Sequence, residues 1–226
     1  MSRFEPSKIA VAVVTGGHTF DVPGFTRLFR SIPGIDPYIQ DIDNWAHDDA
    51  KVRHLYDVTL FFSMHGVEKD SPDATPKGKV REALEALGAT KQGIILLHHA
   101  ILSYNGWPVW TSLVGMDERF VNFQFHHNQK LRIEVANPNH PITKGLSSFE
   151  AIDESYVMPD AQPGNGNDVL LTCDHPKSMR TIGWVRTHRQ SRVFCLELGH
   201  DSVAWENPGF TTVLERGIRW CAGKGV

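Results

Sequence analysis

Histidines directly follow several apolar, strand-like runs of this sequence. His18, His65, the pair His98 and His99, and His200 all stand at such positions, in a chain that contains 12 histidines. Imidazole is the commonest metal ligand in proteins and the side chain that gains or loses a proton most easily near neutral pH. A group of imidazoles can hold zinc with one open position, or can carry out general acid–base catalysis. These residues are therefore the first candidates for a functional site.

The segments around these histidines predict how they are brought together. Residues 94–97 are consecutive apolar residues, which is typical of a strand buried on both faces of a parallel sheet. Strands and helices are then expected to alternate, with strands at 8–14, 38–42, 56–63, 94–97 and 192–198 and helices at 23–32, 44–53, 77–88 and 207–223. This alternation predicts an α/β fold with a mostly parallel sheet flanked by helices. The histidines would converge on the carboxyl edge of that sheet, where ligands bind in such folds.

The middle of the chain follows a different pattern. Residues 130–136 alternate apolar and charged side chains with a period of two, as in a half-exposed strand. Residues 151–158 predict an edge strand, and 169–173 with 181–186 predict an antiparallel pair. We interpret residues 115–190, approximately, as an antiparallel insertion that decorates the sheet of a single domain spanning residues 1–226. An edge strand of this insertion would also support a homodimer.

The composition argues against several classes of protein. A formal net charge of −3 and an isoelectric point near 6.4 offer no electrostatic reason to expect a nucleic-acid partner. No apolar run approaches the roughly 20 residues that span a bilayer, so no membrane partner is expected. The first residues lack the apolar core of a secretory signal. Cys173, Cys195 and Cys221 are widely spaced without a CxxC motif, which fits buried thiols in a cytoplasmic protein.

Two carboxylates complete the candidate catalytic set. Glu154 and Asp201 would orient His98 and His200 for proton transfer without a metal. The same region also suits a divalent metal such as zinc, with His18, His98 and His200 as the expected ligands and Glu154 as a further one. No close-spaced ligand motif selects between these alternatives. A third interpretation is that the histidines cap the strand ends and form only local hydrogen bonds.

Several motifs make the sequence resemble one known family over nearly its whole length. They are Thr15-Gly16-Gly17-His18, Leu97-His98-His99, Asn137-Pro138-Asn139-His140-Pro141-Ile142, Asp153-Glu154-Ser155-Tyr156, and Gly199-His200-Asp201 through Asn207-Pro208. In this order they resemble the trehalose-utilisation, or ThuA-like, family. The resemblance implies a flavodoxin-like sheet of the class I glutamine amidotransferase-like superfamily. It also implies a role in bacterial use of trehalose and related disaccharides, through keto-sugars made by a partner dehydrogenase.

The catalytic cysteine of that superfamily is absent from the expected position. In the superfamily a nucleophilic Cys follows the central strand and a His follows a later strand, and the corresponding positions here are approximately His98 and His200. Glutamine hydrolysis requires a thiolate activated by the histidine. The chain is therefore not expected to be a glutamine amidotransferase.

The resemblance leads to two hypotheses about function. The first is a hydrolase, lyase or isomerase that acts on a disaccharide-derived or keto-sugar substrate at the His-rich site. The second is a non-catalytic sugar-binding or regulatory protein that has lost the nucleophile. In both, the small-molecule sugar is expected to contact the turn glycine, the surrounding histidines and two tyrosines: Gly17, His18, His65, His99, Tyr104, His126 and Tyr156.

Overall fold

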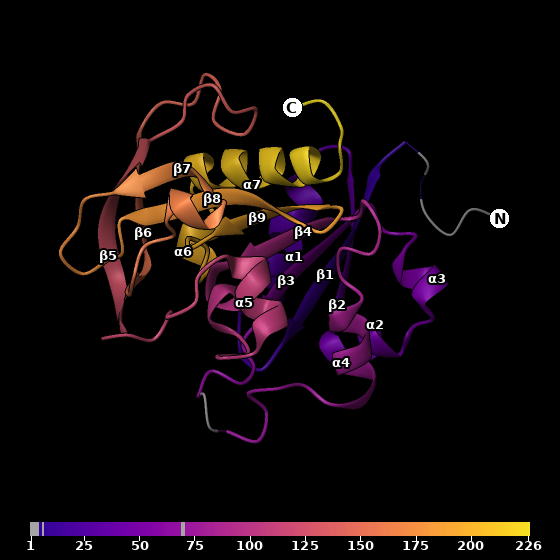
Figure 1. The fold of residues 1–226 in the computed structure, drawn as a ribbon. Helices are drawn as coiled ribbons and strands as arrows, with labels where there is room; N and C mark the ends of the chain where they lie inside the picture. The colour runs from indigo at the N-terminus through magenta and orange to yellow at the C-terminus, as the bar shows by residue number, and fades with distance from the viewer. Residues whose placement is uncertain (1–4, 6, 69–70) are drawn as a thin grey trace.

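The residues that the structure describes are built around one nine-stranded sheet. The computed structural model describes residues 5, 7–68 and 71–226. The parallel part of the sheet consists of β1 (Ile9–Gly16), β2 (Ile35–Asp41), β3 (Val58–Ser63), β4 (Gly93–Leu97) and β9 (Ser191–Leu196). These strands lie in the order β2-β1-β3-β4-β9 (Figure 1), and each neighbouring pair is parallel. This is the flavodoxin-like strand order.

The central strands have the burial that their sequences predict. Every residue of β3 and β4 is buried, and β1 is buried from Ile9 to Thr15. Strands covered by helices on both faces consist of near-continuous apolar residues, because no face of the strand meets water. The predicted α/β fold with a mostly parallel, flavodoxin-like sheet is confirmed.

Helices cover both faces of the parallel strands. One face packs against α1 (Val22–Ser31), α6 (Ser202–Trp205) and α7 (Pro208–Cys221). The other face packs against α2 (Ile42–His47), α4 (Gly78–Glu85) and α5 (Pro108–Val114). Shorter helices are α3 (Ala50–Arg53), η1 (His98–Leu102) and η2 (Pro163–Asn165). In the described part of the chain, no helix has the length and apolar character that crossing a bilayer requires.

One predicted helix is divided in two. Residues 44–53 were expected to form a single helix, but α2 ends at His47 and α3 starts at Ala50. Asp48 and Asp49 both have extended backbone conformations, and the Asp49 side chain accepts a hydrogen bond from the Lys51 N–H. Asp is a favoured N-cap residue, so this aspartate starts a new helix at that point.

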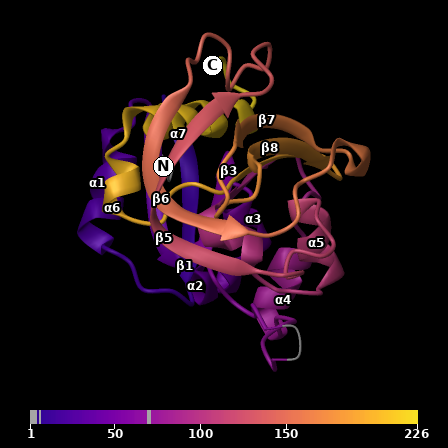
Figure 2. The ribbon, with the colours of Figure 1, turned by 90° about the vertical axis from the view of Figure 1, so that its left-hand side faces the viewer.

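The middle of the chain extends the same sheet with antiparallel strands. These are β5 (Gln124–Val135), β6 (Phe149–Val157), β7 (Asp168–Cys173) and β8 (Thr181–His188). The predicted pairing of 169–173 with 181–186 is confirmed, and β8 joins the block to β9. The expected strand 130–136 forms the second part of a longer strand, β5, which has an irregular register between His126 and Gln129. Figure 2 shows β5 and β6 passing in front of the parallel strands.

Candidate functional site

Four of the predicted histidines lie together at the carboxyl edge of the sheet. His18 follows β1, His98 and His99 follow β4, and His200 follows β9. The ring centroids of His98 and His200 are 5.0 Å apart, those of His98 and His99 are 5.2 Å apart, and those of His18 and His99 are 4.6 Å apart. The expected convergence of strand-end histidines is therefore observed.

His98 occupies a sharp turn from strand to helix. It is fully buried and has a φ of 52°, in the left-handed region that few side chains adopt. A strained turn of this kind, between a strand and a helix, is the geometry of a nucleophile elbow. The turn thus has the backbone geometry of an elbow, with an imidazole at the position where the sequence resemblance implies a thiol.

The hydrogen bonds of His98 fix which of its nitrogens is available. Nδ1 lies 2.6 Å from the backbone carbonyl oxygen of Glu197. A carbonyl only accepts, so Nδ1 carries a proton and, in the neutral ring, Nε2 carries the lone pair. Nε2 lies 2.7 Å from the Tyr156 hydroxyl and 3.1 Å from Nδ1 of His200. A backbone carbonyl that holds the other ring nitrogen is the usual arrangement for a metal-ligating histidine.

Three ligand atoms form a nearly equilateral triangle at this point. The distances are 3.1 Å between His98 Nε2 and His200 Nδ1, 3.4 Å between His98 Nε2 and Glu154 Oε1, and 3.6 Å between His200 Nδ1 and Glu154 Oε1. In a tetrahedral site with bonds of about 2.0–2.1 Å, neighbouring ligand atoms are about 3.3 Å apart. Two imidazoles and one carboxylate therefore have the spacing and the chemistry for zinc or a similar divalent ion.

The charges in this group favour an ionised Glu154 and a neutral His200. Burial acts to raise the pKa of Glu154, but the hydrogen bond and charge of His98, together with His200 and Tyr156, outweigh it and lower the pKa to about 2. The pKa of His200 is lowered by burial and by the nearby charge of His98. An ionised carboxylate and a readily deprotonated imidazole are the forms that bind a metal.

Asp153 holds the loop that carries His200. Its carboxylate accepts the backbone N–H of Gly199 at 2.7 Å, of His200 at 3.0 Å and of Glu154 at 2.8 Å. Burial raises the pKa of Asp153 to about 6, although the His98 charge and these three hydrogen bonds act in the opposite direction. Asp153 therefore ties two residues of the triangle to one anchor.

Glu197 supports the site from the buried side. Its backbone carbonyl binds His98 and its Oε1 accepts the N–H of Tyr156 at 3.0 Å. Burial, followed by the charge of Asp153, raises the pKa of Glu197 well above its usual range, which favours the neutral form of this carboxyl. Neither Asp153 nor Glu197 was among the candidate residues. The available signal was a glutamate inside the otherwise apolar run 192–198.

A cavity of about 410 Å³ lies against the histidine cluster. Its walls consist of His18, Met64, Val67, His99, Leu102, Phe123, Phe125, His127, Glu154 and Tyr156. Glu154 and Tyr156 belong both to the cavity wall and to the network around His98. Glu154 Oε2 also lies 2.7 Å from His127 Nδ1. Because a carboxylate in its ionised form only accepts, Nδ1 of His127 carries a proton, and in the neutral ring Nε2 carries the lone pair.

Two predicted residues of the cavity wall, His18 and His99, lie near the turn that follows β1, and the predicted Gly17 forms that turn without being part of the wall. Gly17 has a φ of +72°, and a Cβ there would lie 2.1 Å from the Met64 carbonyl oxygen, so only glycine permits this turn beside His18. His99 is buried between Phe62 and His18, and neither of its ring nitrogens has a partner among the described residues. Burial and the surrounding histidines lower the pKa of His99 well below its usual range, so the ring is neutral.

Other predicted residues are placed outside the cavity wall. Tyr104 is buried in the core and its ring stacks on that of His65, 6.0 Å away, behind the Gly16–Gly17 turn. His126 precedes the cavity-lining His127, and successive side chains of a strand point to opposite faces. The Asp201 carboxylate accepts the N–H groups of Val203 and Ala204 and thereby caps α6.

The group of side chains that could hold a metal also differs from the expected one. Among the described residues the group is His98, Glu154 and His200, without His18. The ring of His18 packs against His99 and lies 5.8 Å from that of His200. Glu154 takes the third corner because β6 passes over the ends of β4 and β9.

The cysteines lie away from the elbow. Cys173, Cys195 and Cys221 are all buried and free. Burial raises the pKa of each of these thiols. A neutral, buried thiol is a poor nucleophile, so none of the three supplies the thiolate that glutamine hydrolysis requires.

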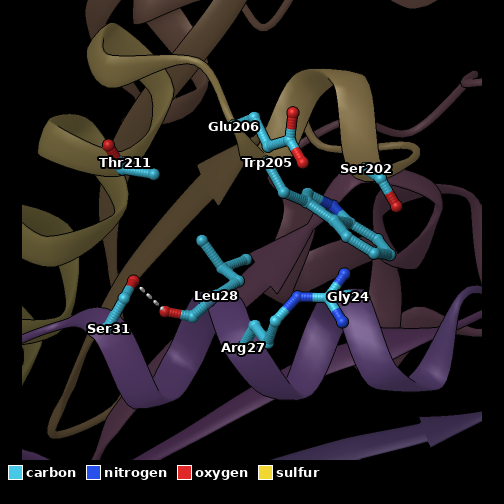
Figure 3. Close-up of a pocket in the computed structure, with 8 residues that line it drawn as sticks. All are labelled: Gly24, Arg27, Leu28, Ser31, Ser202, Trp205, Glu206 and Thr211. Atoms are coloured by element: carbon cyan, nitrogen blue, oxygen red, sulfur yellow. Dashed lines mark hydrogen bonds between the residues drawn. The ribbon is translucent and has the colours of Figure 1, made fainter.

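A second hollow, of about 280 Å³, lies between helices. Figure 3 shows that Gly24, Arg27, Leu28 and Ser31 line it from α1, opposite Ser202, Trp205, Glu206 and Thr211 from the α6–α7 segment. Arg27 and Glu206 are the ionisable side chains of this lining, and the histidine cluster is not part of it. Of these two cavities, the first is the candidate site, because it lies against the described group of side chains that could hold a metal.

Solved structures with this fold include ThuA-like proteins and an amidotransferase. A ThuA-like protein from Parabacteroides merdae has a TM-score of 0.73 at 19% identity, over 97% of this chain and 92% of that one. A ThuA-like protein from Bacteroides uniformis has a TM-score of 0.72 at 18% identity, over 97% and 94%. A glutamine amidotransferase from Thermotoga maritima has a TM-score of 0.50 at 8% identity, over 94% and 98%. At these identities the similarities establish the fold.

Sequence comparison supplies the family. No curated protein matches this chain. The sequence model of the ThuA family, described as trehalose utilisation, matches residues 42–221. That range includes β4, β6 and β9, with all three corners of the His98–Glu154–His200 triangle. The chain therefore belongs to the ThuA family.

Proposed function

We propose that this protein is an enzyme of carbohydrate catabolism that converts a disaccharide-derived keto-sugar, with a divalent metal such as zinc held by His98, Glu154 and His200. The observation that carries the proposal is the triangle of ligand atoms, 3.1 to 3.6 Å apart, beside a cavity of about 410 Å³. Membership of a family described as trehalose utilisation supports a sugar as the substrate.

The residues around the triangle suit proton transfer next to a carbonyl group. A divalent metal at this point supplies a Lewis acid that polarises a carbonyl oxygen or acidifies a water molecule. His127 is the proposed base. Its Nδ1 lies 2.7 Å from Glu154 Oε2 and donates to it, which leaves the Nε2 lone pair of the neutral ring for the cavity. Nε2 takes the proton from the carbon beside the ketone. When the bond to an oxygen on the next carbon then breaks, the protonated His127 returns the proton to that oxygen.

The side chains of the cavity favour an uncharged substrate. No lysine or arginine is among the described residues that line the cavity. A phosphate or carboxylate on the sugar would thus find no basic side chain to pair with on these walls. The reaction that supplies the substrate would be an oxidation of one sugar hydroxyl to a ketone by a dehydrogenase.

The alternative is a non-catalytic sugar-binding or regulatory protein. Catalysis requires at least two titratable groups within reach of a common point, whereas binding does not. The 3.1 Å separation of the His98 and His200 nitrogens, with Glu154 Oε1 within 3.6 Å of both, favours the enzyme.

Adjacent histidines on β5 offer a matched test of this proposal. The substrate to assay is trehalose in which one hydroxyl has been oxidised to a ketone, with unmodified trehalose as the comparison. His127→Ala should lower turnover of the keto-sugar by about 10²–10⁴-fold, the usual contribution of a general base. His126→Ala should leave turnover within about twofold, because this side chain is not part of the cavity wall.

Two results would contradict the proposal that the protein is an enzyme of this kind. The first is binding of the keto-sugar without any turnover by the metal-loaded wild type, which would establish the binding protein instead. The second is equal turnover by His127→Ala and wild type, which would remove His127 from the mechanism.

A further inference from the structure

The side chains that line the cavity are of two chemical kinds. The polar ones are those of His18, His99, His127, Glu154 and Tyr156. The apolar ones, which we call the apolar half of the lining, are those of Met64, Val67, Leu102, Phe123 and Phe125. None of these five side chains has a strong hydrogen-bond donor or acceptor.

Several of the polar groups are bonded to one another beside the triangle. Both oxygens of Glu154 face imidazoles, with His98 and His200 at Oε1 and His127 at Oε2. The Tyr156 hydroxyl is bonded to His98. His99 also lines the cavity, and neither of its ring nitrogens has a partner among the described residues. This part of the lining can therefore recognise one polar ring of a substrate.

The apolar half presents aromatic surface at the mouth of the site. Phe125 is 56% exposed, which is high for a large aromatic side chain in a strand. Phe123 lies deeper, with its ring centroid 5.7 Å from that of Tyr156. Exposed apolar side chains that line a cavity next to polar catalytic groups are typical of a ligand-binding surface.

A second sugar unit fits this half poorly. Each of its hydroxyls would lose water and find no side-chain partner on these walls, which disfavours binding. A flat apolar group would cover Phe123 and Phe125, and its transfer out of water would be favourable because it gives up no hydrogen bonds. The distribution of polar and apolar walls thus distinguishes between two kinds of glycoside.

We propose that the substrate is an uncharged glycoside with a flat apolar aglycone, which packs against Phe123 and Phe125 while the oxidised sugar ring faces the His98–Glu154–His200 group. This inference rests on the proposed function, because it takes the polar part of the cavity lining as the sugar site. It departs from the family description in placing an apolar group, in place of a second sugar, on the outer wall.

Binding of unreactive glucosides tests the inference without requiring catalysis. Phenyl glucoside, methyl glucoside in the same anomeric form, and trehalose are titrated into the wild-type protein by isothermal calorimetry. Phenyl glucoside should bind at least about tenfold more tightly than either of the others, which corresponds to about 1.4 kcal/mol. In Phe125→Ser the advantage should fall below about threefold. Ile152→Ser is the matched control, because Ile152 is 46% exposed on the neighbouring strand and outside the cavity.

The outcomes separate this inference from the proposed function. Trehalose that binds as tightly as phenyl glucoside would overturn the apolar aglycone and leave a sugar enzyme in place. A phenyl preference that survives in Phe125→Ser would also overturn it, since the aromatic wall would not be the binding surface. If none of the three sugars binds and the keto-sugar is not turned over, the proposed function fails and the inference fails with it.

Discussion

Replacing Glu154 by glutamine should change the acid stability of the metal-free protein. The carboxylate is mostly buried, and its pKa of about 2 lies below the ordinary 4.5 because His98 and His200 stabilise the ionised form. This difference corresponds to about 3 kcal/mol of folding free energy at neutral pH. A lowered folded-state pKa gives stability that is present above pH 4.5 and lost as the pH falls towards 2. By pH 3, about 2 kcal/mol of it should be gone.

The assay is urea denaturation from pH 6 to pH 3 in the presence of a chelator. The free energy of unfolding of wild type should fall by about 2 kcal/mol more than that of Glu154→Gln, because glutamine does not titrate. Glu150→Gln is the matched control on the same strand, since Glu150 is exposed and pairs with Lys130 at 3.0 Å. Such a surface pair contributes at most about 1 kcal/mol. Parallel pH curves for wild type and Glu154→Gln would refute the interaction between this carboxylate and the imidazoles.

Two further substitutions test the parts that position the site. Gly17→Ala should lower the free energy of unfolding by at least about 3 kcal/mol, because the new Cβ would combine a positive φ with a collision against backbone. Gly145→Ala is the control: its φ is similar but the space around it is open, so it should cost only about 1–2 kcal/mol in the same urea titration. Equal losses in the two variants would contradict the close packing of the Gly17 turn. Asp153→Asn should cost about 1–3 kcal/mol at pH 8, because an amide N–H would face the buried N–H of Gly199. For Asp201→Asn the free energy of unfolding should stay within about 0.5 kcal/mol of wild type, because Asn caps helices equally well. A larger loss in Asp201→Asn than in Asp153→Asn would contradict the role of Asp153 as the anchor of the His200 loop and of Asp201 as a helix cap.

The parallel half of the fold could be read from the sequence because its strands are continuous apolar runs. Residues 94–97 are all apolar, which predicts a strand buried on both faces of the sheet. The polar residue that follows this run marks the edge of the sheet. The same signal located His98 and His200, since a strand's end is local information. Their proximity then followed from parallel order, which the strand–helix alternation predicts.

The remainder of the site depends on contacts between segments far apart in the chain. Successive residues of a strand face opposite sides, so the pairing register decides whether His126 or His127 faces the cavity. The irregular register between His126 and Gln129 cannot be predicted from the alternation of residues in the sequence. Asp153 works through the backbone of residues 199–200, which only the passage of β6 over β9 brings near. Asp201 did have a local signal, because an aspartate just before a short helical segment is a typical N-cap.

Metal content is the most direct measurement of the central claim. The experiment uses wild-type protein purified without an affinity tag and three variants, His98→Ala, His200→Ala and the exposed His54→Ala. Each protein is incubated with zinc and manganese, the excess metal is removed, and the bound metal is measured by elemental mass spectrometry. We predict near-stoichiometric metal in wild type and His54→Ala, and its loss in both His98→Ala and His200→Ala. Absence of bound metal in wild type, or its retention when either ligand is removed, would contradict a metal centre at His98, Glu154 and His200.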